Sequence, residues 1–484
     1  MEGLEAKELL ISQLIDNRFR IDAEYYQKKY LELAKKIELF NPKTINKLHV
    51  KLDCSAFYPS IVSDYNFEFN GIPFLRVDDI KAGFVSVTNN TAFLLPKVLD
   101  TNHNTIAKAY PGDILIAKGG NTLGKIGLLT EEYPEYSICR DVLLLRTSVL
   151  DDSIRYYLWS FLNSIHGYNL LFRTASQTGQ PHLTLASIAE IKVPTFGMEF
   201  KVIYKKLFHK IEILKKKSEL LYVQSEHIVL NELGLLQLNI TKSNQNIKSL
   251  KNSFLSTGRL DAEYYQPKYD ILFNHLNGIE TKKLGSIVNI KKSIEPGSDA
   301  YQDSGIPFVR VSNISKFGLM DTEIYLNANK YSNEELYPKK DSILLSKDGS
   351  VGIAYKIEED MKLITSGALL HLNIIDDEFL PDYLTLVLNS QIVQLQAERD
   401  AGGSIIQHWK PSEIEEVIIP KLPLDNQKKI SDLIQESFKL KKQSKQLLDI
   451  AKKAVEIAIE QDEVAGIDYI NSYSELMQKD RKLH

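Results

Sequence analysis

The chain has 484 residues, too many for one hydrophobic core, and this length predicts two to four domains. Its 43% hydrophobic and 25% charged residues are typical of a globular protein. The formal net charge of -4 counts mildly against nucleic-acid binding, because phosphate contacts usually show as an excess of positive charge. Cys54 and Cys139 lack metal-ligand spacing and exclude a disulfide framework. Residues 1–15 do not resemble a signal peptide and no apolar run could cross a bilayer, so we expect a cytoplasmic protein.

In chain order, the first predicted elements are a short helix and a mixed domain. The helix starts at the sequence Asp-Ala-Glu-Tyr-Tyr, where Asp22 is a suitable cap, as is Asp261 where this sequence recurs. Over residues 40–198, runs of β-branched and aromatic residues alternate with Gly, Pro, Asn and Asp. Short strands are predicted at 74–77, 114–117 and 142–145, and a helix at 154–164. The pattern predicts a mixed α/β domain.

A long helix follows this domain. One series of residues spaced by seven consists of Leu207, Leu214, Leu221 and Ile228. A second series, three positions earlier, consists of Tyr204, Ile211, Ser218 and Ser225. Two such stripes form the seam of a coiled coil, and the small residues favour close packing against a second helix.

The remaining chain repeats the same order of motifs. The offset between copies shrinks from 239 to 234, 229 and 226, as small loop deletions in the second copy would produce. The repeated pairs are 20–30 with 259–269, 71–77 with 305–311, 113–118 with 342–347, and 182–194 with 408–420. Strands at 308–311 and 343–346 and a helix at 380–390 match the first copy. The heptads also recur at an offset of 226, from Ile430 to Ala454. We infer a tandem duplication, with two long helices packed antiparallel.

Three stretches carry a resemblance to a known family. Residues 179–194 look like the end of a target-recognition domain in the specificity subunits of type I restriction-modification systems. Residues 112–118 resemble a recurrent strand and turn of that domain, and 418–427 contain the Pro-Leu-x-x-Gln that typically starts a spacer helix. The resemblance covers about 20–460. Residues 194–198 lack this Pro-Leu-x-x-Gln pattern, so the resemblance does not define where the first spacer helix starts.

The resemblance implies an α+β chain with two similar target-recognition domains separated by two antiparallel coiled-coil helices in a pseudo-two-fold repeat. Each domain would read one half of a bipartite, asymmetric DNA site. Two methyltransferase subunits would dock on the spacer helices, and restriction or translocase subunits could join. S-adenosylmethionine, and ATP with Mg, would belong to those partners, and this chain would be non-catalytic. The expected boundaries are 1–198 and 237–423 for the domains with their leading segments, 199–236 and 424–462 for the helices, and 463–484 for a tail.

Two predicted loops in each domain carry candidate DNA contacts. Base reading needs bidentate side chains on loops, whereas phosphate contacts need Lys, Ser, Thr or main-chain amides. The first loops supply Ser176, Gln177, Thr178, Gln180, His182 and, after a strand, Lys118, Asn121 and Lys125. The second loops supply Ser404, Gln407, His408, Lys410 and, after a strand, Lys347 and Ser350. The two histidines occur in both copies, so they suit a cap or brace for the following helix better than the reading of two different sequences. The strand-end turns could equally be simple hairpins.

Arg76 and Arg310 lie within apolar strands at the same place in both copies, where structural pairing with a carboxylate is favoured over base contact. The basic run over residues 201–217 suits DNA, a protein partner or a solvated helix face.

Motifs for three enzyme activities are absent from the sequence. The chain has no glycine-rich cofactor loop with an Asn/Asp-Pro-Pro-aromatic motif, and no clustered carboxylates of a nuclease. Gly119–Lys125 resembles a phosphate-binding loop, but Ile126 follows where Ser or Thr would ligate magnesium. A DNA-specificity subunit is therefore preferred, and a non-catalytic, protein-binding adaptor built on a coiled coil is the alternative.

Overall fold

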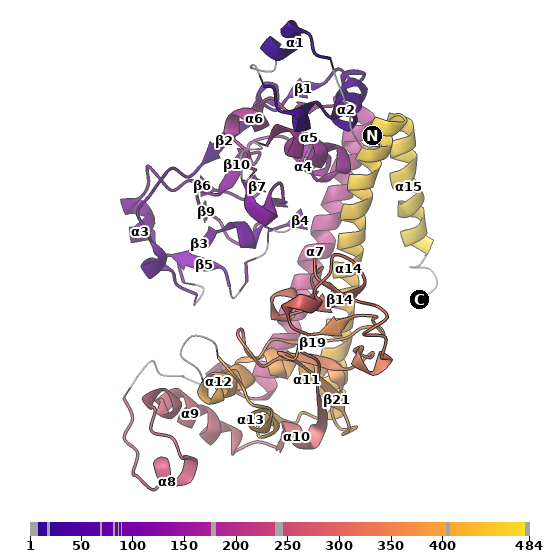
Figure 1. Ribbon diagram of the computed structural model, residues 1–484. Helices are drawn as coiled ribbons and strands as arrows, with labels where there is room; N and C mark the ends of the chain where they lie inside the picture. Colours follow the sequence, from indigo (N-terminus) through magenta and orange to yellow (C-terminus); the bar gives the residue numbers. More distant parts are fainter. Residues whose placement is uncertain are drawn as a thin grey trace. The chain divides into compact units, whose positions relative to one another are not determined.

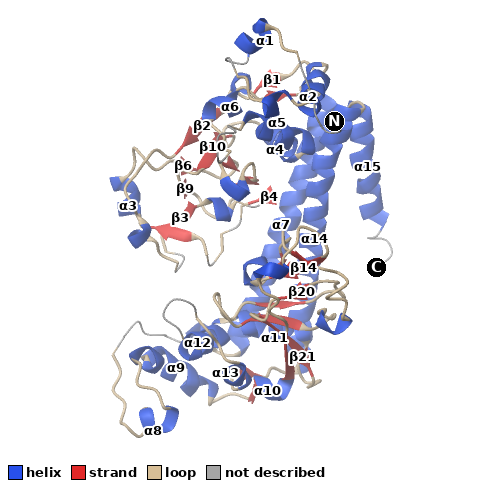
Figure 2. Ribbon diagram, viewed as in Figure 1, coloured by secondary structure: helices blue, strands red, loops and turns tan. Residues whose placement is uncertain are grey.

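The computed structural model describes residues 8–16, 20–67, 70–80, 83–85, 87–88, 90–175, 181–237, 245–402 and 407–479. They form two compact units. The first comprises Met1–Leu214 with Lys442–His484, and the second comprises Lys215–Lys441. Strands and helices are mixed in both units, as the expected fold class requires (Figure 2). None of the described helices has the length and hydropathy needed to span a bilayer.

The first unit is built around two sheets (Figure 1). A five-stranded sheet has the order β2-β10-β7-β8-β4, with bounds Lys51–Cys54, Val142–Arg146, Ile114–Ala117, Ile126–Leu128 and Gly83–Phe84. A four-stranded sheet has the order β5-β3-β9-β6, with bounds Ala92–Leu94, Ile72–Leu75, Tyr136–Ile138 and Lys108–Ala109. The strands β1 (Lys43–Thr44) and β11 (Lys192–Val193) pair separately. One core cluster joins both sheets, because Phe74, Ile138 and Leu144 are all buried in it.

Helices surround these sheets in the first unit. The shorter ones are α1 (Ile11–Asp16), α2 (Lys28–Glu38), α3 (Pro96–Thr101), α4 (Asp152–Asn163), α5 (Ile165–Thr174) and α6 (Leu185–Ala189). Helix α4 begins where Asp151 accepts a hydrogen bond from the Ser153 N–H (2.9 Å), which is a typical side-chain cap. Within the last part of the chain, α15 (Glu463–Lys479) lies beside the end of α14 (Leu424–Glu460) (Figure 1).

The second unit repeats the strand arrangement in reduced form. Its four-stranded sheet has the order β13-β21-β18-β19, with bounds Val288–Lys292, Leu369–Ile374, Ile343–Ser346 and Ala354–Lys356. A three-stranded sheet has the order β17-β14-β20, with bounds Tyr325–Leu326, Ile306–Val309 and Ile364–Thr365. Two small sheets pair β12 (Thr281–Lys283) with β22 (Ile418–Pro420), and β15 (Ile314–Ser315) with β16 (Gly318–Leu319). The helices are α8 (Phe254–Thr257), α9 (Pro267–Leu276), α10 (Leu284–Ile287), α11 (Pro381–Asn389), α12 (Gln391–Asp400) and α13 (Pro411–Glu415).

The register of the central strands confirms the duplication. Val142 lies opposite Ala117 in the first sheet, and Leu369 lies opposite Ser346 in the second, at the offsets that the sequence motifs predict. Tyr157 Oη donates to the Pro194 carbonyl (2.9 Å), and Tyr383 Oη donates to the Pro420 carbonyl (2.8 Å). The two copies therefore share a framework and not only a set of motifs.

Helices α7 (Met198–Glu232) and α14 pack antiparallel, as the heptads predict. In the second unit, Ser218 Oγ donates to the Ser437 carbonyl (2.8 Å) and Ser437 Oγ donates to the Ser218 carbonyl (2.7 Å). In the first unit, Ser444 Oγ donates to the Ile211 carbonyl (3.3 Å) and Tyr204 Oη donates to the Ala451 carbonyl. From Tyr204 to Ile211 to Ser218, the contacts advance along α7 in steps of seven residues. Their partners Ala451, Ser444 and Ser437 step back along α14 by the same number. The small-residue stripe is buried in both helices because serine allows close approach.

The two long helices begin differently, which explains the missing motif before α7. Gln427 of α14 is fully buried; it accepts from the Leu380 N–H (2.9 Å) and donates to the Leu422 carbonyl (2.8 Å). Before α7, the Gly197 N–H instead donates to the Glu463 carboxylate of α15 (2.8 and 2.9 Å). A carboxylate suits the amide groups at a helix start. The C-terminal helix thus supplies a cap where the first copy has no glutamine.

Candidate nucleic-acid interface

In the first domain, four chain segments lie side by side at the strand ends. The Cys139 N–H donates to the Leu75 carbonyl, the Lys118 N–H to the Asp141 carbonyl, and the Leu183 N–H to the Lys118 carbonyl (2.9 Å each). We call residues 75–76, 118–125, 139–142 and 181–183 the first rim. It joins the two loops that the sequence suggests separately, because Gly119 and His182 form a β-bridge across them.

The second domain builds the same arrangement. The Ser366 N–H donates to the Val309 carbonyl (2.9 Å), the Lys347 N–H to the Ala368 carbonyl (2.9 Å), and the Trp409 N–H to the Lys347 carbonyl (2.8 Å). We call residues 309–310, 347–352, 366–369 and 407–410 the second rim. Two equivalent rims, each assembled from strand ends and loops, are suitable places for nucleic-acid contact.

The histidines lie across the two loops of each rim, and the following helices begin at Thr184 and Lys410, so the expected role as helix caps is wrong. His408 Nδ1 lies 2.9 Å from Asp348 Oδ1, across the bridge between the two loops. His182 packs on Gly119, where an added Cβ would lie 2.3 Å from the ring Nδ1, so a side chain would clash there. Helix α6 is capped by Thr184, whose hydroxyl accepts from the Ser187 N–H (3.1 Å).

The predicted contact residues differ in how freely they present their charges. In the first rim, Lys125 is exposed, Lys118 is half-buried, and Asn121 belongs to the short 3-10 turn Gly120–Thr122. Strand β8 follows Lys125 directly, whereas a nucleotide-binding loop requires a helix there. The other predicted contacts of this domain, Ser176, Gln177, Thr178 and Gln180, lie outside the described residues, as does Ser404 of the second domain.

In the second rim, Lys347 Nζ forms an ion pair with the Asp348 carboxylate, which also contacts His408. A phosphate would have to compete with that carboxylate. Ser350 and Gln407 are exposed, and the Gln407 carbonyl accepts from the Gly349 N–H (3.0 Å). Lys410 is 74% exposed at the start of α13 and lies 3.2 Å from Glu413.

The two strand arginines behave differently. Arg76 has the predicted carboxylate partner: its Nε lies 3.7 Å from Asp79 Oδ2, and its guanidinium also donates to the Asn90 carbonyl. Burial raises the pKa of Asp79, and hydrogen bonds from the Arg76 N–H and the Thr91 hydroxyl oppose that shift. In the second copy, Asn313 occupies the place of Asp79, and Arg310 is exposed. The pairing prediction is therefore confirmed for Arg76 and wrong for Arg310.

Arg140 lies in the turn between β9 and β10 and is a further candidate contact that no sequence motif indicates. Its side chain is 56% exposed, and its guanidinium is 3.8 Å from Asp141 Oδ2. The equivalent residue of the second copy is Gly367, so no repeated motif marks the position. Its place beside the repeated Lys118 strand end is visible only in the fold.

The repeated Arg-x-Asp motif anchors a helix end rather than capping one, which corrects the role expected for Asp22 and Asp261. Neither aspartate side chain caps the turn after it. Asp22 instead pairs with Arg20 (2.6 Å), whose guanidinium donates to the carbonyls of Thr174 and Ala175 at the end of α5 (2.9 and 2.6 Å). In the second copy, Arg259 pairs with Asp261 and donates to the Asp400 carbonyl at the end of α12 (3.3 Å).

Two features of the described chain bear on enzyme chemistry. Burial raises the pKa of Cys139 to about 11, so the thiol remains protonated at neutral pH. Within the described ranges, no group of three or more His, Cys, Asp or Glu side chains is placed to hold a metal ion. The rims thus offer cationic and amide groups for binding.

Residues 277–449 match the family model of the type I restriction modification DNA specificity domain. The chain is also similar to the S subunit of a type I restriction-modification system from M. genitalium, at 15% identity over 85% of this chain and 94% of that one, with a TM-score of 0.34. The HsdS subunit from Thermoanaerobacter tengcongensis is 13% identical over 85% and 97% of the two chains, with a TM-score of 0.27. Because both TM-scores are below 0.5, neither structural similarity supports an argument about this chain. The residues that match the family model include the whole second rim.

Proposed function

The chain belongs to the family of type I restriction-modification DNA specificity proteins, and we propose that its two domains read the two halves of one bipartite, asymmetric DNA site. The family model matches the second copy directly. Four motifs in the same order, with equivalent strand registers, extend the assignment to the first copy. The chain is the non-catalytic recognition component, and it acts with DNA and with methyltransferase subunits.

The observation that carries this proposal is the rim built twice from diverged residues. A homodimer presents identical surfaces and reads a palindrome, whereas two diverged copies can read two different half-sites. Lys118 and Lys347 are equivalent in both rims and therefore suit phosphate, which is the same in every sequence. Asn121, Gln177, Gln180, Gln407 and Lys410 differ between the copies and suit base edges.

The remaining rim contacts that we propose are sequence-independent. Lys125, Ser176, Thr178, Ser350 and Ser404 offer a cation or hydroxyls for phosphate oxygens. His182 and His408 brace the loops, and as repeated residues they contribute position rather than specificity.

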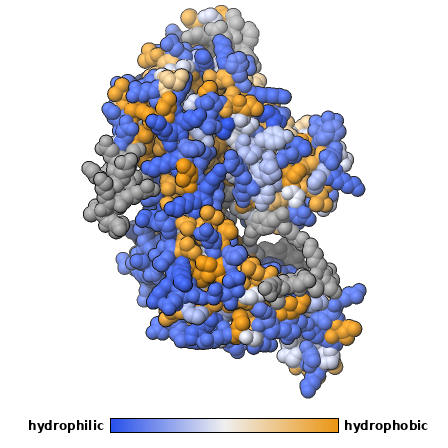
Figure 3. Space-filling view, turned by 180° about the vertical axis from the view of Figure 1, so that it is seen from behind, coloured by the Kyte–Doolittle hydropathy of each residue, from blue (hydrophilic) through white to orange (hydrophobic). Residues whose placement is uncertain are grey.

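Helix α7 supports the docking of partner subunits. Its residues Val202 and Ile213 are 44% and 55% exposed in the first unit, and Leu220 and Val223 are each 57% exposed in the second. Figure 3 shows apolar residues set among polar ones on one face of the molecule. We propose that methyltransferase subunits cover the apolar side chains of the spacer helices. Those subunits would carry S-adenosylmethionine, and any restriction subunits would carry ATP with Mg.

We place the protein in the cytoplasm, with its DNA. The expected helix length of about 35 residues corresponds to about 50 Å, more than one turn of duplex. This length suits an unread spacer between the half-sites.

The test is to map methylated adenines in cells that carry this protein with its neighbouring methyltransferase. Matched cells lack only this chain. The expected result is one asymmetric motif, with two short blocks around a fixed gap, that disappears in the matched cells. Unchanged methylation in those cells, with the methyltransferase expressed, would support the protein-binding adaptor instead.

A further inference from the structure

The clearest difference between the two rims lies in one turn, which joins β9 to β10 in the first domain and β20 to β21 in the second. In the first rim this turn carries Arg140, whose guanidinium carbon is 5.8 Å from the centre of the Phe57 ring. Phe57 is 78% exposed, so a cation and an aromatic side chain share the surface at this point. In the second rim the turn carries Gly367, and a Cβ added there would lie 3.0 Å from Glu295 Oε1. One copy therefore carries a guanidinium, with Asp141 beside it, where the other carries only the carboxylate of Glu295.

The strand end beside this turn shows the opposite difference. Arg76 of the first copy is held by the buried Asp79 and by the Asn90 carbonyl, and only 31% of its side chain is exposed. Arg310 of the second copy is exposed and forms no ion pair with any residue that the structure describes. The change from Asp79 to Asn313 removes the carboxylate that would neutralise it, while the Arg310 N–H still donates to Asn313 Oδ1 (3.0 Å).

Each rim thus presents one exposed guanidinium at a position where the other copy has none: Arg140, whose partner Asp141 is itself exposed, and Arg310. We propose that Arg140 reads a guanine in one half-site and that Arg310 reads a guanine in the other. The proposal rests on the function proposed above and names the residues that set its specificity. The planar guanidinium fork matches O6 and N7 of guanine in the major groove, and no other base pair offers the same two acceptors.

The alternative role for these arginines is phosphate binding. Phosphate is the same in both half-sites, and the repeated lysines Lys118 and Lys347 already fit that role in both copies. Arg140 and Arg310 occupy non-equivalent positions, which is the property that different half-sites demand. Glu295 adds to the difference, because a carboxylate can accept from a cytosine amino group but repels phosphate.

The experiment maps the methylated motif in cells expressing the wild-type chain, Arg140→Gln or Arg310→Gln with the methyltransferase. Arg140→Gln should lose preference at a single G·C pair in one half-site, by about 10- to 100-fold, and leave the other half unchanged. Arg310→Gln should do the same in the other half-site. Exposed lysines away from the rims, changed as Lys97→Gln in α3 and Lys340→Gln, are the matched controls for lost charge.

Three outcomes would overturn the proposal while leaving the two-reader function intact. A wild-type motif without guanine in one half-site would exclude base reading by one of the arginines. A uniform fall in methylation at an unchanged motif would assign the arginine to phosphate. An unchanged motif at unchanged level would remove it from the interface. Absence of any methylation dependent on this chain would instead reject the proposed function itself.

Discussion

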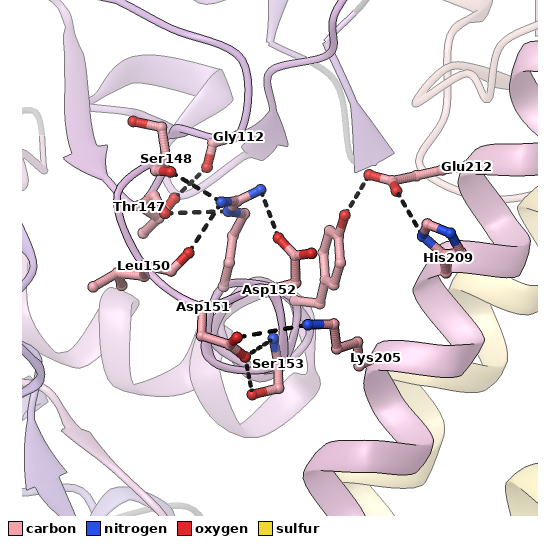
Figure 4. A network of polar contacts seen from close by, with 12 residues as sticks. Gly112, Thr147, Ser148, Leu150, Asp151, Asp152, Ser153, Lys205, His209 and Glu212 are labelled. Carbon is pink, nitrogen blue, oxygen red and sulfur yellow. Dashed lines mark hydrogen bonds and ion pairs between the residues drawn. The ribbon is translucent and has the colours of Figure 1, made fainter.

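The two domains are attached to their following helices by different chemistry. In the first domain, Tyr156 of α4 stacks on Phe208 of α7 with ring centres 4.4 Å apart, and Trp159 meets the same ring edge-on at 5.6 Å. At the edge of this stack, Asp151 faces Lys205 and Glu212 lies beside His209 (Figure 4). The Tyr156 hydroxyl donates to Glu212. The attachment is mainly aromatic, with ion pairs at its edge.

The second domain places a buried ion pair at the equivalent position. Lys356 takes the place of Leu128, as the strand registers show, and Asp382 takes the place of Tyr156, because each precedes the tyrosine that binds the equivalent proline carbonyl. Lys356 Nζ lies 2.7 Å from Asp382 Oδ1, with the two side chains only 7% and 4% exposed. From α14, Ser431 Oγ and Gln435 Nε2 donate to Asp382 Oδ2 (2.6 and 2.9 Å). Burial alone would lower the pKa of Lys356, but the carboxylates of Asp382 and Glu358 outweigh it and raise that pKa.

The comparison shows which parts of a duplicated domain are free to diverge. The main-chain framework is kept, since Tyr157 and Tyr383 bind equivalent proline carbonyls. The side chains that meet the helix have been exchanged as sets, aromatic in one copy and ionic in the other. A set must change together, because a single charged member left in a buried apolar site would cost several kcal/mol. The two domains should therefore respond differently to lost charge and to acid.

The largest effect is expected from Asp382→Ala. This change removes the buried carboxylate beside the Lys356 ammonium and leaves only Glu358 (3.3 Å), and we expect the second domain to lose about 3–5 kcal/mol of unfolding free energy. The chain has two tryptophans, Trp159 in the first domain and Trp409 in the second, both buried. Denaturant unfolding followed by fluorescence in Trp159→Phe and Trp409→Phe backgrounds therefore reports each domain separately.

The control for this prediction replaces both charges. The double variant Lys356→Leu with Asp382→Leu should recover most of the loss, because an apolar pair no longer needs charge compensation. Equal destabilisation of both domains by Asp382→Ala, or no recovery in the double variant, would contradict a local ionic attachment.

Lowering the pH should reduce the unfolding free energy of the second domain by slightly less than Asp382→Ala does. His371 of β21 is buried, contacts Thr365 Oγ1 (2.8 Å), and occupies the place of Leu144 in the first sheet. Burial lowers the pKa of His371 to about 4, with the charge of Lys291 adding to the shift. The unfolded chain binds this proton near pH 6.5 and the folded chain does not, so stability falls as the pH drops from about 6.5 to about 4. The loss approaches about 3 kcal/mol at the acid end.

Unfolding followed at Trp409 between pH 4 and 7 measures this loss. His371→Leu installs the residue of the first copy and should flatten the dependence, although Thr365 then loses a partner. A second domain whose unfolding free energy has the same pH slope with and without His371 would show that other groups control it.

The comparison also shows what the sequence could predict. The duplication, the strands at 114–117 and 343–346 and the antiparallel helices follow from spacing, because heptads and strand runs are local patterns. The cap of α7 could not be predicted, because Glu463 supplies it from more than 260 residues away. The exposure of Arg310 and the place of Arg140 in the rim could not be predicted for the same reason. The burial of Asp79 and the meeting of four chain segments at the rim are properties of the fold. The roles of the loop glutamines remain predictions.

The smallest effect is expected from Tyr156→Phe, which keeps the aromatic stack and removes only the hydroxyl. Burial raises the pKa of Tyr156 and Glu212 adds to the shift, so the phenol stays protonated and donates to that carboxylate. Glu212 is 34% exposed and can bind water once the hydroxyl is gone, so the first domain should lose about 1 kcal/mol. Glu212→Gln should cost a similar amount, and the double variant no more than either single one, as measured at Trp159 in a double-mutant cycle. A loss of 3 kcal/mol or more for Tyr156→Phe would mean that the hydroxyl, and not the stacked ring, holds the first domain on α7.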